Sequence, residues 1–407
     1  MKLNNITDIK SKIENYKISF SDIKKVVNAI KINRGNIRIV GGMVRDLLLK
    51  QNKSSEIDLV TNLDPSEIID AFRKSNIEYI TVGLKYGCIT AKINGKLIEI
   101  TSLRKDVEND GRWPVVEYTK DWKLDAKRRD FTINSIYIDF NGNIYDSENG
   151  IKDLKNKKTI FIGNPVKRIK EDYLRILRFF RFTFLYSKKF HNESFNACVK
   201  YRKCLRKLSF ERRFNEISKL IKLKNFEDNF SVLDKYSFLE EIFETSINKK
   251  NVLEFFKIER KLKQICQIRR IKFLLKKKKT KFFDVFSKKE IKRVQMFFSI
   301  NDYCFSSLKK KIYLYGRDNL IDQLIFDAAE NKIKLEDLKK LIKSINLYDV
   351  PKFPISGNDI KAFGIKESQE VGYLKKKVEK WWLENGLIFT KEECIDFLKK
   401  LPACKRG

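Results

Sequence analysis

Histidine is nearly absent from this sequence: His191 is the single histidine among 407 residues. This scarcity argues against zinc cages and against catalytic triads that depend on a histidine base. The seven cysteines form no C-x-x-C pair, which is a second argument against a zinc site. No segment approaches the roughly 18 apolar residues of a membrane span, and the first residues lack the apolar core of a secretory signal. We therefore expect no membrane association. We prefer a location in the cytoplasm, with an organellar matrix as the alternative if the source is eukaryotic.

Acidic residues are also scarce relative to basic ones. Asp and Glu number 53 against 87 Lys and Arg, which gives a formal net charge of +34. Basic residues are dense from Lys257 to Arg293, including the run from Lys276 to Lys279. A polyanionic partner would explain the surplus through phosphate contacts, which give affinity but do not read sequence. A lysine-rich genome explains it equally well, and the charge alone does not decide between the two.

Hydrophobic patterning divides the chain into a mixed α/β part and a helical part. The Asn94-Gly95 dipeptide predicts a hairpin, so the sheet should be largely antiparallel. Apolar residues recur at helical spacing from Val166 onward, after a break at Asn164-Pro165. We therefore predict an α+β protein whose sheet lies within about the first 160 residues. Strands are predicted at 37–40, 57–60, 77–82, 88–93, 96–101, 136–140 and 144–145, and helices at 43–50 and 65–74.

A glycine pair stands between the first predicted strand and the helix that follows it. Gly41 and Gly42 let the backbone approach a ligand, and the helix start offers free N–H groups to an anion. Arg45, in the first helical turn, could add a charged fork to a phosphate. A tight turn into a helix is the commoner meaning of such a pair, so the motif needs support from its surroundings.

Two carboxylates follow on the next predicted strand. Glu56 and Asp58 are two residues apart, so they should point to one face of the strand, about 7 Å apart along the chain. Such a pair can share divalent cations, and magnesium prefers oxygen ligands. A solvated strand edge is the alternative, and the preceding glycine pair and Arg45 favour the metal site. Glu99, on a later strand, is either a third carboxylate of this cluster or an exposed residue.

Several segments, taken in order, resemble the class II tRNA nucleotidyltransferases, that is, the CCA-adding enzymes and their poly(A) polymerase relatives. The end of the chain is similar to that of the α-proteobacterial and organellar-type members, and the resemblance covers nearly the whole chain. The segments that carry it are 37–61 (IRIVGGMVRDLLLKQNKSSEIDLVT), 125–134 (DAKRRDFTIN), 146–154 (DSENGIKDL), 171–175 (EDYLR) with Arg178 and Arg181, 208–212 (LSFER), 353–359 and Trp381-Trp382.

The resemblance implies a polymerase-β-like nucleotidyltransferase head followed by an all-helical neck, body and tail. These parts would span 1–160, 161–225, 226–350 and 351–407. It also implies the addition of C, C and A to the 3′ end of tRNA from CTP and ATP, without a nucleic-acid template and with release of pyrophosphate. Magnesium would serve in a two-metal mechanism, and the body and tail would bind the acceptor and T-arm half of tRNA.

The resemblance also assigns roles to individual residues. The family usually has Asp at the position of Glu56, whose extra methylene could move a metal ligand by about 1 Å. The implied roles are metal binding and catalysis for Glu56 and Asp58; triphosphate binding for Gly42 and Arg45; ribose and phosphate contacts for Arg128 and Asp130; base reading for Asp172 and Arg175, with support from Arg178 and Arg181; and addition of the final adenosine for a flexible loop with Asp106, Asp110 and Arg112.

Base reading by Asp172 and Arg175 has a physical rationale. If one helix carries both, they are neighbours on one face, because they are three residues apart. Cytosine and adenine each offer an amino donor beside a ring-nitrogen acceptor, which suits a carboxylate beside a guanidinium. Uracil and guanine present the opposite pattern and would leave both charged groups unpaired. The alternative is a surface ion pair, but Arg178 and Arg181 continue a stripe that suits a triphosphate or an RNA backbone.

The segment from Arg104 to Val115 is polar, contains Gly111 and Pro114, and is not expected to form a buried strand. By the resemblance it is the flexible loop that enzymes adding only the two cytidines lack, so it favours complete addition. Two rival functions remain within the family: a poly(A) polymerase, and a partial enzyme that adds only CC or only A. A rival of another class is a non-catalytic RNA-binding remnant, which the intact acidic and basic site residues disfavour.

Overall fold

The computed structural model describes residues 6–14, 18–51, 57–108, 115–276, 280–365 and 368–401. The chain forms two compact units, Met1–Glu244 and Thr245–Gly407. The finer division into head, neck, body and tail stays a prediction.

The first unit contains a seven-stranded sheet with the strand order β3-β4-β5-β2-β1-β8-β9. The β2–β5 pairing is parallel, and the other pairings are antiparallel, so the prediction of a mixed, largely antiparallel sheet is confirmed. The strands are β1 (Ile37–Val40), β2 (Asp58–Thr61), β3 (Glu78–Ile80), β4 (Cys88–Ile93), β5 (Lys96–Ser102), β8 (Tyr137–Asp139) and β9 (Ile144–Tyr145).

Local sequence signals account for several of these elements. Asn94 and Gly95 both have positive φ angles, as a two-residue hairpin turn between β4 and β5 requires. Helix α4 (Pro65–Lys74) begins with Pro65, and Asp64 and Glu67 form a capping box at its start. Helices α1 (Ile6–Glu14), α2 (Phe20–Ile32), α3 (Gly42–Leu49) and α6 (Gly150–Lys155), and the 3₁₀ turns η1 (Leu84–Tyr86) and η2 (Thr132–Asn134), complete this part of the chain.

Helix α5 (Trp122–Arg128) covers part of one sheet face. Its Ala126 packs with Val40, Val60 and Tyr137 in a small buried cluster. Val60 is two residues from Asp58 on β2, so Asp58 lies on the face of the sheet that α5 partly covers.

The segment from Arg104 to Val115 differs from its prediction. Residues Arg104–Glu108 form strand β6, which pairs with β7 (Val115–Tyr118) in a separate two-stranded sheet. The run Arg-Lys-Asp-Val-Glu has almost no apolar alternation, so hydrophobic patterning gives no strand signal here. The flexible loop that the resemblance implies for the whole segment is therefore wrong for Arg104–Glu108 and Val115, which are strand residues. The expectation that the segment forms no buried strand is not contradicted, since Arg104 and Lys105 are only half-buried.

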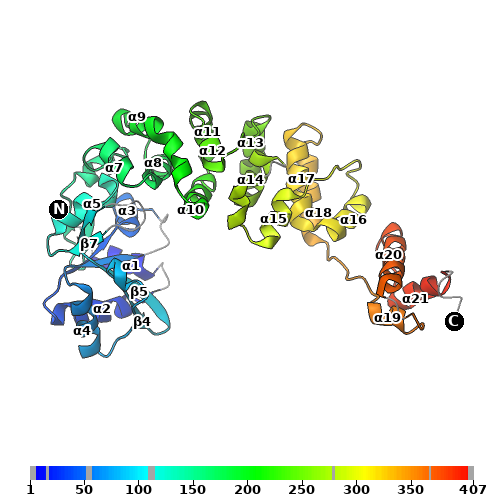
Figure 1. Ribbon diagram of the computed structural model, residues 1–407, viewed down its shortest axis with the longest axis horizontal. Helices are drawn as coiled ribbons and strands as arrows, with labels where there is room; N and C mark the ends of the chain where they lie inside the picture. The colour runs from blue at the N-terminus through cyan, green and yellow to red at the C-terminus, as the bar shows by residue number, and fades with distance from the viewer. Residues whose placement is uncertain are drawn as a thin grey trace. The chain divides into compact units, whose positions relative to one another are not determined.

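Helices follow the sheet in the first unit, as Figure 1 shows. A cluster of aromatic rings joins them to the sheet domain: Phe161 stacks on Phe179 with ring centroids 5.7 Å apart, and Phe131 contacts both rings. The elements are α7 (Pro165–Glu171), α8 (Leu174–Tyr186), α9 (Asn192–Tyr201), η3 (Arg202–Lys207), α10 (Phe210–Ile221), α11 (Phe226–Lys235) and α12 (Phe238–Phe243).

Among its described residues, the second unit contains helices joined by irregular segments and no strand. Trp382 is buried in the core of its C-terminal part, where it contacts Tyr313 and Phe353. No described helix in the chain is both long and apolar enough to cross a membrane. The elements are α13 (Val252–Leu262), α14 (Gln267–Leu275), η4 (Lys281–Val285), α15 (Lys288–Gln295), α16 (Phe305–Tyr315), α17 (Arg317–Ala329), α18 (Leu335–Leu347), α19 (Gly357–Lys361), α20 (Ser368–Glu384) and α21 (Lys391–Lys399).

Candidate active site

The turn at Gly41 and Gly42 lies against the carboxylate of Asp58. Gly41 has φ +78° and precedes α3, whose first residue is the buried Gly42. A Cβ atom at position 41 would lie 2.7 Å from Oδ2 of Asp58. Glycine is therefore needed at position 41 both for its backbone angle and for the close approach of the carboxylate. This contact brings the predicted anion-binding turn and a predicted metal ligand into one place.

Asp58 is the first residue of β2 and is exposed, in register with Val40 of β1. Glu56 lies outside the described residues, so the expectation that both carboxylates share one strand face stays a prediction. Oxygen ligands from Asp58 and Glu56 are the donor type that magnesium prefers.

Glu99 lies on the strand beside Asp58. Leu59 pairs with Ile100 in the parallel β2–β5 ladder, so Glu99 is the neighbour of Asp58 one residue back along each strand. Burial raises the pKa of the Cys88 thiol, and the negative charges of Glu99 and Asp58 raise it further, so both carboxylates lie within electrostatic reach of this thiol. Within the described ranges, no group of three or more His, Cys, Asp or Glu side chains is placed to hold a metal. The role of Glu99 as a third carboxylate therefore stays a prediction.

Arg45 is buried and turns toward the helices that follow the sheet. Its Nη1 donates to Oδ1 of Asn134, and its guanidinium lies 4.9 Å from the ring of Phe182 and 5.1 Å from that of Tyr186. The contact with Asn134 connects the helix after the glycine turn to the segment around Asp130. The predicted contact of Arg45 with a triphosphate stays a prediction.

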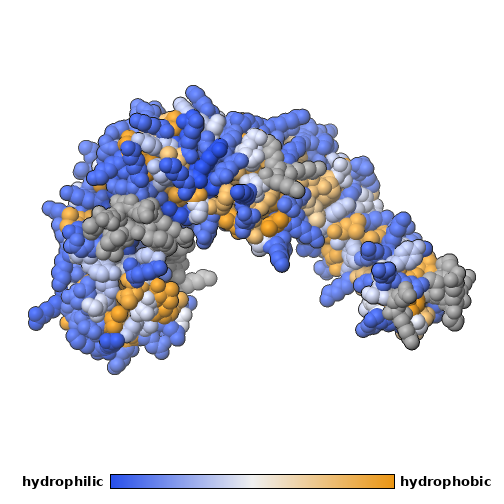
Figure 2. All heavy atoms as spheres, in the orientation of Figure 1, coloured by the Kyte–Doolittle hydropathy of each residue, from blue (hydrophilic) through white to orange (hydrophobic). Residues whose placement is uncertain are grey.

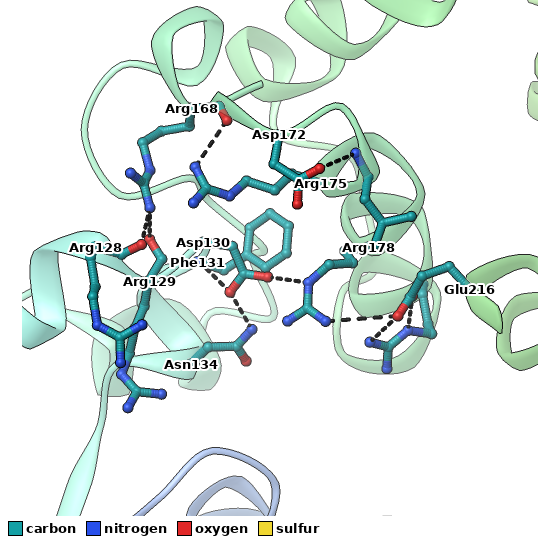
Figure 3. Close-up of polar contacts among 12 residues, drawn as sticks. Arg128, Arg129, Asp130, Phe131, Asn134, Arg168, Asp172, Arg175, Arg178 and Glu216 are labelled. Atoms are coloured by element: carbon teal, nitrogen blue, oxygen red, sulfur yellow. Dashed lines mark hydrogen bonds and ion pairs between the residues drawn. The ribbon is translucent and has the colours of Figure 1, made fainter. Parts of the chain in front are cut away.

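Asp130 is the centre of the next set of contacts, shown in Figure 3. Its Oδ1 accepts from Nδ2 of Asn134 at 2.8 Å, and its Oδ2 accepts from Nε of Arg178 at 2.6 Å. Burial by itself would raise the pKa of Asp130, but Arg178 and Asn134 outweigh it and hold this pKa well below its usual range. Asp130 is therefore a charged, oriented acceptor between the sheet domain and α8.

Arg128 is held by the buried carboxylate of Asp125, to which the sequence motifs gave no role. Its Nη2 lies 2.7 Å from Oδ1 of Asp125, and Arg129 binds the other oxygen, Oδ2, at 3.0 Å. Burial would raise the pKa of Asp125, but Arg129 and Arg128, with a hydrogen bond from Tyr137, lower it to about 2. Arg128 is thus already paired with Asp125 within α5. Its contact with the ribose and phosphates stays a prediction.

The predicted base-reading pair does not lie on one helix. Helix α7 ends at Glu171 and α8 begins at Leu174, so Asp172 lies between them in extended conformation, with φ −156° and ψ 110°. Its Oδ1 accepts from the backbone N–H of Leu174 at 3.1 Å, so the carboxylate helps to start α8. The expectation of a shared helix face was wrong, because the chain breaks the helix between the two residues.

The partners of Asp172 and Arg175 also differ from expectation. Both oxygens of Asp172 accept from Nη2 of Arg212, at 3.1 and 2.9 Å. Nη1 of Arg175 donates to Oε2 of Glu171 at 2.6 Å and to the carbonyl of Arg168 at 2.9 Å. The alternative of a simple ion pair between Asp172 and Arg175 is therefore wrong as well, because each has a charged partner of its own, Arg212 and Glu171 respectively.

Arg178 and Arg181 do not form an open basic stripe. Arg181 binds Glu216 of α10 with 2.8 Å between Nε and Oε2, and Arg178 lies between Glu216 and Asp130. The Arg178 side chain is 32% exposed and that of Arg181 14%, so Arg178 has more of its surface available to a ligand. The sequence spacing was right about the side of the helix, but it could not show that carboxylates already neutralise these cations.

Known proteins resemble this chain along almost its whole length. CCA tRNA nucleotidyltransferase 1, mitochondrial, of Homo sapiens is 33% identical over 390 residues, which cover 89% of this chain and 86% of that protein. The mouse protein of the same name is 31% identical over 407 residues, with 93% and 90% covered. This chain belongs to the CCA tRNA nucleotidyltransferase family. The CCA-adding enzyme of Lactococcus lactis subsp. lactis is 28% identical, over 96% of this chain and 100% of that protein.

Family models and solved structures agree with this membership. A model described as "Poly A polymerase head domain" matches residues 37–160, and one described as "Probable RNA and SrmB- binding site of polymerase A" matches 189–247. The crystal structure of the Bacillus stearothermophilus CCA-adding enzyme in complex with CTP has a TM-score of 0.72 and 20% identity, with 94% of this chain and 97% of that chain covered. This likeness confirms the fold: a nucleotidyltransferase head followed by helices.

Several residues that hold the candidate site together were not predicted from the sequence. Four side chains hold the predicted site residues in place, although the sequence motifs gave them no role. They are Arg168, Glu171, Arg212 and Glu216. The positions of Arg212 in 208–212 and of Glu171 in 171–175 were available as signals, whereas Glu216 lies in no motif. Of the predicted loop residues, Asp106 belongs to β6, and Asp110 and Arg112 lie outside the described residues.

Proposed function

We propose that this chain adds C, C and A to the 3′ end of tRNA from CTP and ATP, without a nucleic-acid template and with release of pyrophosphate. The observation that carries the proposal is the meeting of the glycine turn with Asp58 in one site, in a chain of this family. CCA-adding enzymes with the same fold have been solved in complexes with CTP, with ATP and with tRNA, which supports these three as ligands.

The reaction is a nucleotidyl transfer. The 3′-hydroxyl of the tRNA attacks the α-phosphate of the nucleotide, a phosphorus–oxygen bond forms, and the bond to the leaving pyrophosphate breaks. Gly42 and Arg45 would hold the triphosphate at the start of α3, where the helix offers free N–H groups. Arg128 and Asp130 would hold the ribose and phosphates, from the turn at the end of α5.

Asp58 and Glu56 would hold magnesium, and the exposed carboxylate of Asp58 beside the glycine turn fits a cation that also contacts a triphosphate. Magnesium bound there would lower the pKa of the attacking hydroxyl and stabilise charge on the phosphates. Removal of divalent cations with EDTA should abolish incorporation, and added magnesium should restore it.

Asp172 and Arg175 would read the base. The carboxylate of Asp172 accepts from the exocyclic amino group of C or A, and the guanidinium of Arg175 donates to the ring nitrogen beside it. Within the described part of the chain, Arg175 makes its hydrogen bonds through Nη1, which leaves Nε and Nη2 for a base. Both oxygens of Asp172 already accept from Arg212, so a base would bind beside Arg212 or in exchange for one of its bonds.

The helices of the predicted body and tail, residues 226–407, would bind the acceptor and T-arm half of tRNA by shape and through phosphates, as suits A-form RNA. Hydrophilic residues cover much of the face drawn in Figure 2, and the net charge of the chain is +34. Mitochondrial and bacterial relatives support a matrix or a cytoplasmic location.

The test is incubation of the purified chain with tRNA that lacks its CCA end and with all four nucleotides, followed by sequencing of the 3′ end. We expect C-C-A and nothing further. The name of the matched head-domain model favours poly(A) polymerase as the second candidate. Long A tails on generic RNA would support that candidate, products ending in CC or in A alone would support a partial enzyme, and no incorporation would support a non-catalytic RNA-binding protein.

A further inference from the structure

Arg168 is a buried arginine of α7 that joins the two halves of the proposed nucleotide site. Its Nη2 donates to the backbone carbonyls of Arg128 and Arg129, and its Nη1 donates to Oε2 of Glu171. The residue is 8% exposed. No role was assigned to it by motif, and it lies too deep to serve as an ordinary surface cation.

The two carbonyls belong to the C-terminal end of α5. A helix leaves its last carbonyls without partners inside the helix, and they carry partial negative charge. The Arg168 guanidinium satisfies two of them at once and so caps α5. Arg128, the last residue of α5, and Asp130, two residues further on, are the proposed ribose and phosphate contacts. Arg168 therefore fixes the position of the turn from which these two side chains extend.

The other side of Arg168 fixes the base-reading side chain. Oε2 of Glu171 accepts from Arg168 and also from Nη1 of Arg175, and the backbone carbonyl of Arg168 accepts from the same Nη1 at 2.9 Å. Arg175 is thus held by the carboxylate that Arg168 orients and by the Arg168 peptide group. Figure 3 shows this path from the carbonyls of Arg128 and Arg129 through Arg168 to Arg175.

We propose that Arg168 is a positioning residue that sets the distance between the ribose-and-phosphate contacts and the base-reading Arg175, and thereby contributes to the choice of C and A over U and G. The inference rests on the proposed function and extends it. Arg168 itself is not expected to touch the nucleotide. A planar guanidinium can bridge two carbonyls and a carboxylate, whereas the ammonium of lysine is a point charge with different geometry. The conservative change Arg168→Lys should therefore disturb the spacing while it keeps the charge.

The chain offers a closely matched control in Arg213. This arginine is 1% exposed, and its Nη1 donates to the carbonyls of Glu241 and Ile242 at the end of α12, at 3.3 and 2.9 Å. Its Nη2 binds Glu244 at 2.6 Å. Arg213 thus performs the same capping without a contact to the proposed site, and Arg213→Lys should cost comparable stability without altering nucleotide choice.

The experiment measures kcat and KM for CTP, ATP and UTP with tRNA lacking its CCA end, together with Tm, for the wild type, Arg168→Lys and Arg213→Lys. We expect Arg168→Lys to lower the preference for CTP over UTP by about tenfold or more, since small misplacements in a site carry effects of this size. The KM for CTP should rise, the KM for tRNA should stay within about twofold of the wild type, and Arg213→Lys should keep the wild-type preference.

Equal preference in Arg168→Lys and the wild type would overturn the inference, and so would an equal loss of preference in both variants, because stability alone would then explain it. If Arg168→Lys does not fold, Glu171→Gln tests the same path, because it weakens the hold on Arg168 and Arg175 together; a folded Glu171→Gln with wild-type preference also overturns the inference. A wild type that incorporates no nucleotide refutes the proposed function first and this inference with it.

Discussion

Each of the two units contains a cluster of arginines around buried carboxylates, and the clusters differ in their access to solvent. In the first unit, Asp130 and Glu216 hold Arg178 and Arg181, and the Arg178 side chain is 32% exposed. In the second unit, Glu259 and Asp322 hold four cations, and both carboxylates have 0% exposed side chains. The cations of this second cluster are Arg269, Arg270, Lys272 and Arg293.

The difference teaches that a buried charge network does not by itself identify a functional site. Both clusters shift pKa values, since arginines lower the pKa of Asp130 in one and of Asp322 in the other, against the effect of burial. The first cluster is connected through Asn134 and Arg45 to the helix that follows the glycine turn. The carboxylates of the second cluster are fully buried between helices. We therefore assign chemistry to the first cluster and structural support to the second, and the following changes test this division.

The largest effect is expected at Asp58. The change Asp58→Ala removes a proposed metal ligand, whose loss costs several kcal/mol of transition-state stabilisation. Incorporation of CTP should fall by about 10³-fold or more, because each 1.36 kcal/mol corresponds to tenfold. Asp396→Ala, on an exposed carboxylate paired with Lys399, is the control and should keep full activity. Persistent tRNA-dependent incorporation by Asp58→Ala would refute the metal assignment.

In the second unit, changes to the buried cluster should lower the free energy of unfolding rather than the activity. The change Glu259→Ala leaves the buried Arg270 without its carboxylate partner, 2.6 Å away in the structure, and should cost about 3–5 kcal/mol. Hydrogen exchange in α13 and α17 measures this loss locally. Glu254→Ala, on a half-exposed ion pair with Lys257, should cost less than about 1 kcal/mol. A Glu259→Ala protein that keeps its exchange protection but loses nucleotide choice would reverse our division of the clusters.

At Asp172 we expect a smaller effect on the rate and a selective loss of nucleotide preference. The change Asp172→Ala removes the proposed acceptor for the amino group of C and A, so the preference over U and G should fall by about 10-fold to 100-fold. Binding of tRNA, measured by filter retention, should change little. The matched change Glu211→Ala, on the residue before Arg212, removes a nearby carboxylate without removing the proposed reader. Unchanged nucleotide preference in Asp172→Ala would exclude its role in base reading.

The smallest effect is a pH dependence in the second unit. Burial, together with the nearby charge of Arg293, lowers the pKa of Lys272 from its ordinary 10.5 to about 8, against the attraction of Asp322. Between these values the unfolded chain binds more protons than the folded one, so the free energy of unfolding should rise with pH, by at most about 1.4 kcal/mol per pH unit.

The measurement is urea unfolding of the full chain between pH 8 and 10, in which hydrogen exchange reports the unfolding of the second unit. The change Lys272→Met should remove the rise, and Lys340→Met, on a lysine that is 79% exposed, should leave it in place. A rise of the same size in Lys272→Met would assign the pH dependence to other groups.

Much of the fold could be predicted from the sequence because its signals are local. The hairpin at Asn94-Gly95 and the start of α4 at Pro65 depend on neighbouring residues and were placed correctly. Strand β6 was missed because its residues are polar, and the break at Asp172 was missed because no proline or glycine marks it. These two features depend on pairing and on partners distant in the sequence.

The candidate site shows the same limit. The residue types and motif spacing gave Asp58, Asp130, Asp172 and Arg175 as candidates, but not their partners. Arg212 lies 40 residues from Asp172, and no pattern in one sequence connects them. Long-range ion pairs of this kind are set by the packing of α8, α10 and the sheet domain, so they could be identified only in the folded structure.

A crystal structure of the chain with CTP and magnesium tests the central claim most directly. We predict a triphosphate at the start of α3 beside Gly41, with magnesium bound by the Asp58 carboxylate, and a cytosine whose amino group donates to Asp172 while Arg175 donates to its ring nitrogen. An empty cleft around Asp58, or a CTP bound away from Asp172 and Arg175, would contradict the account.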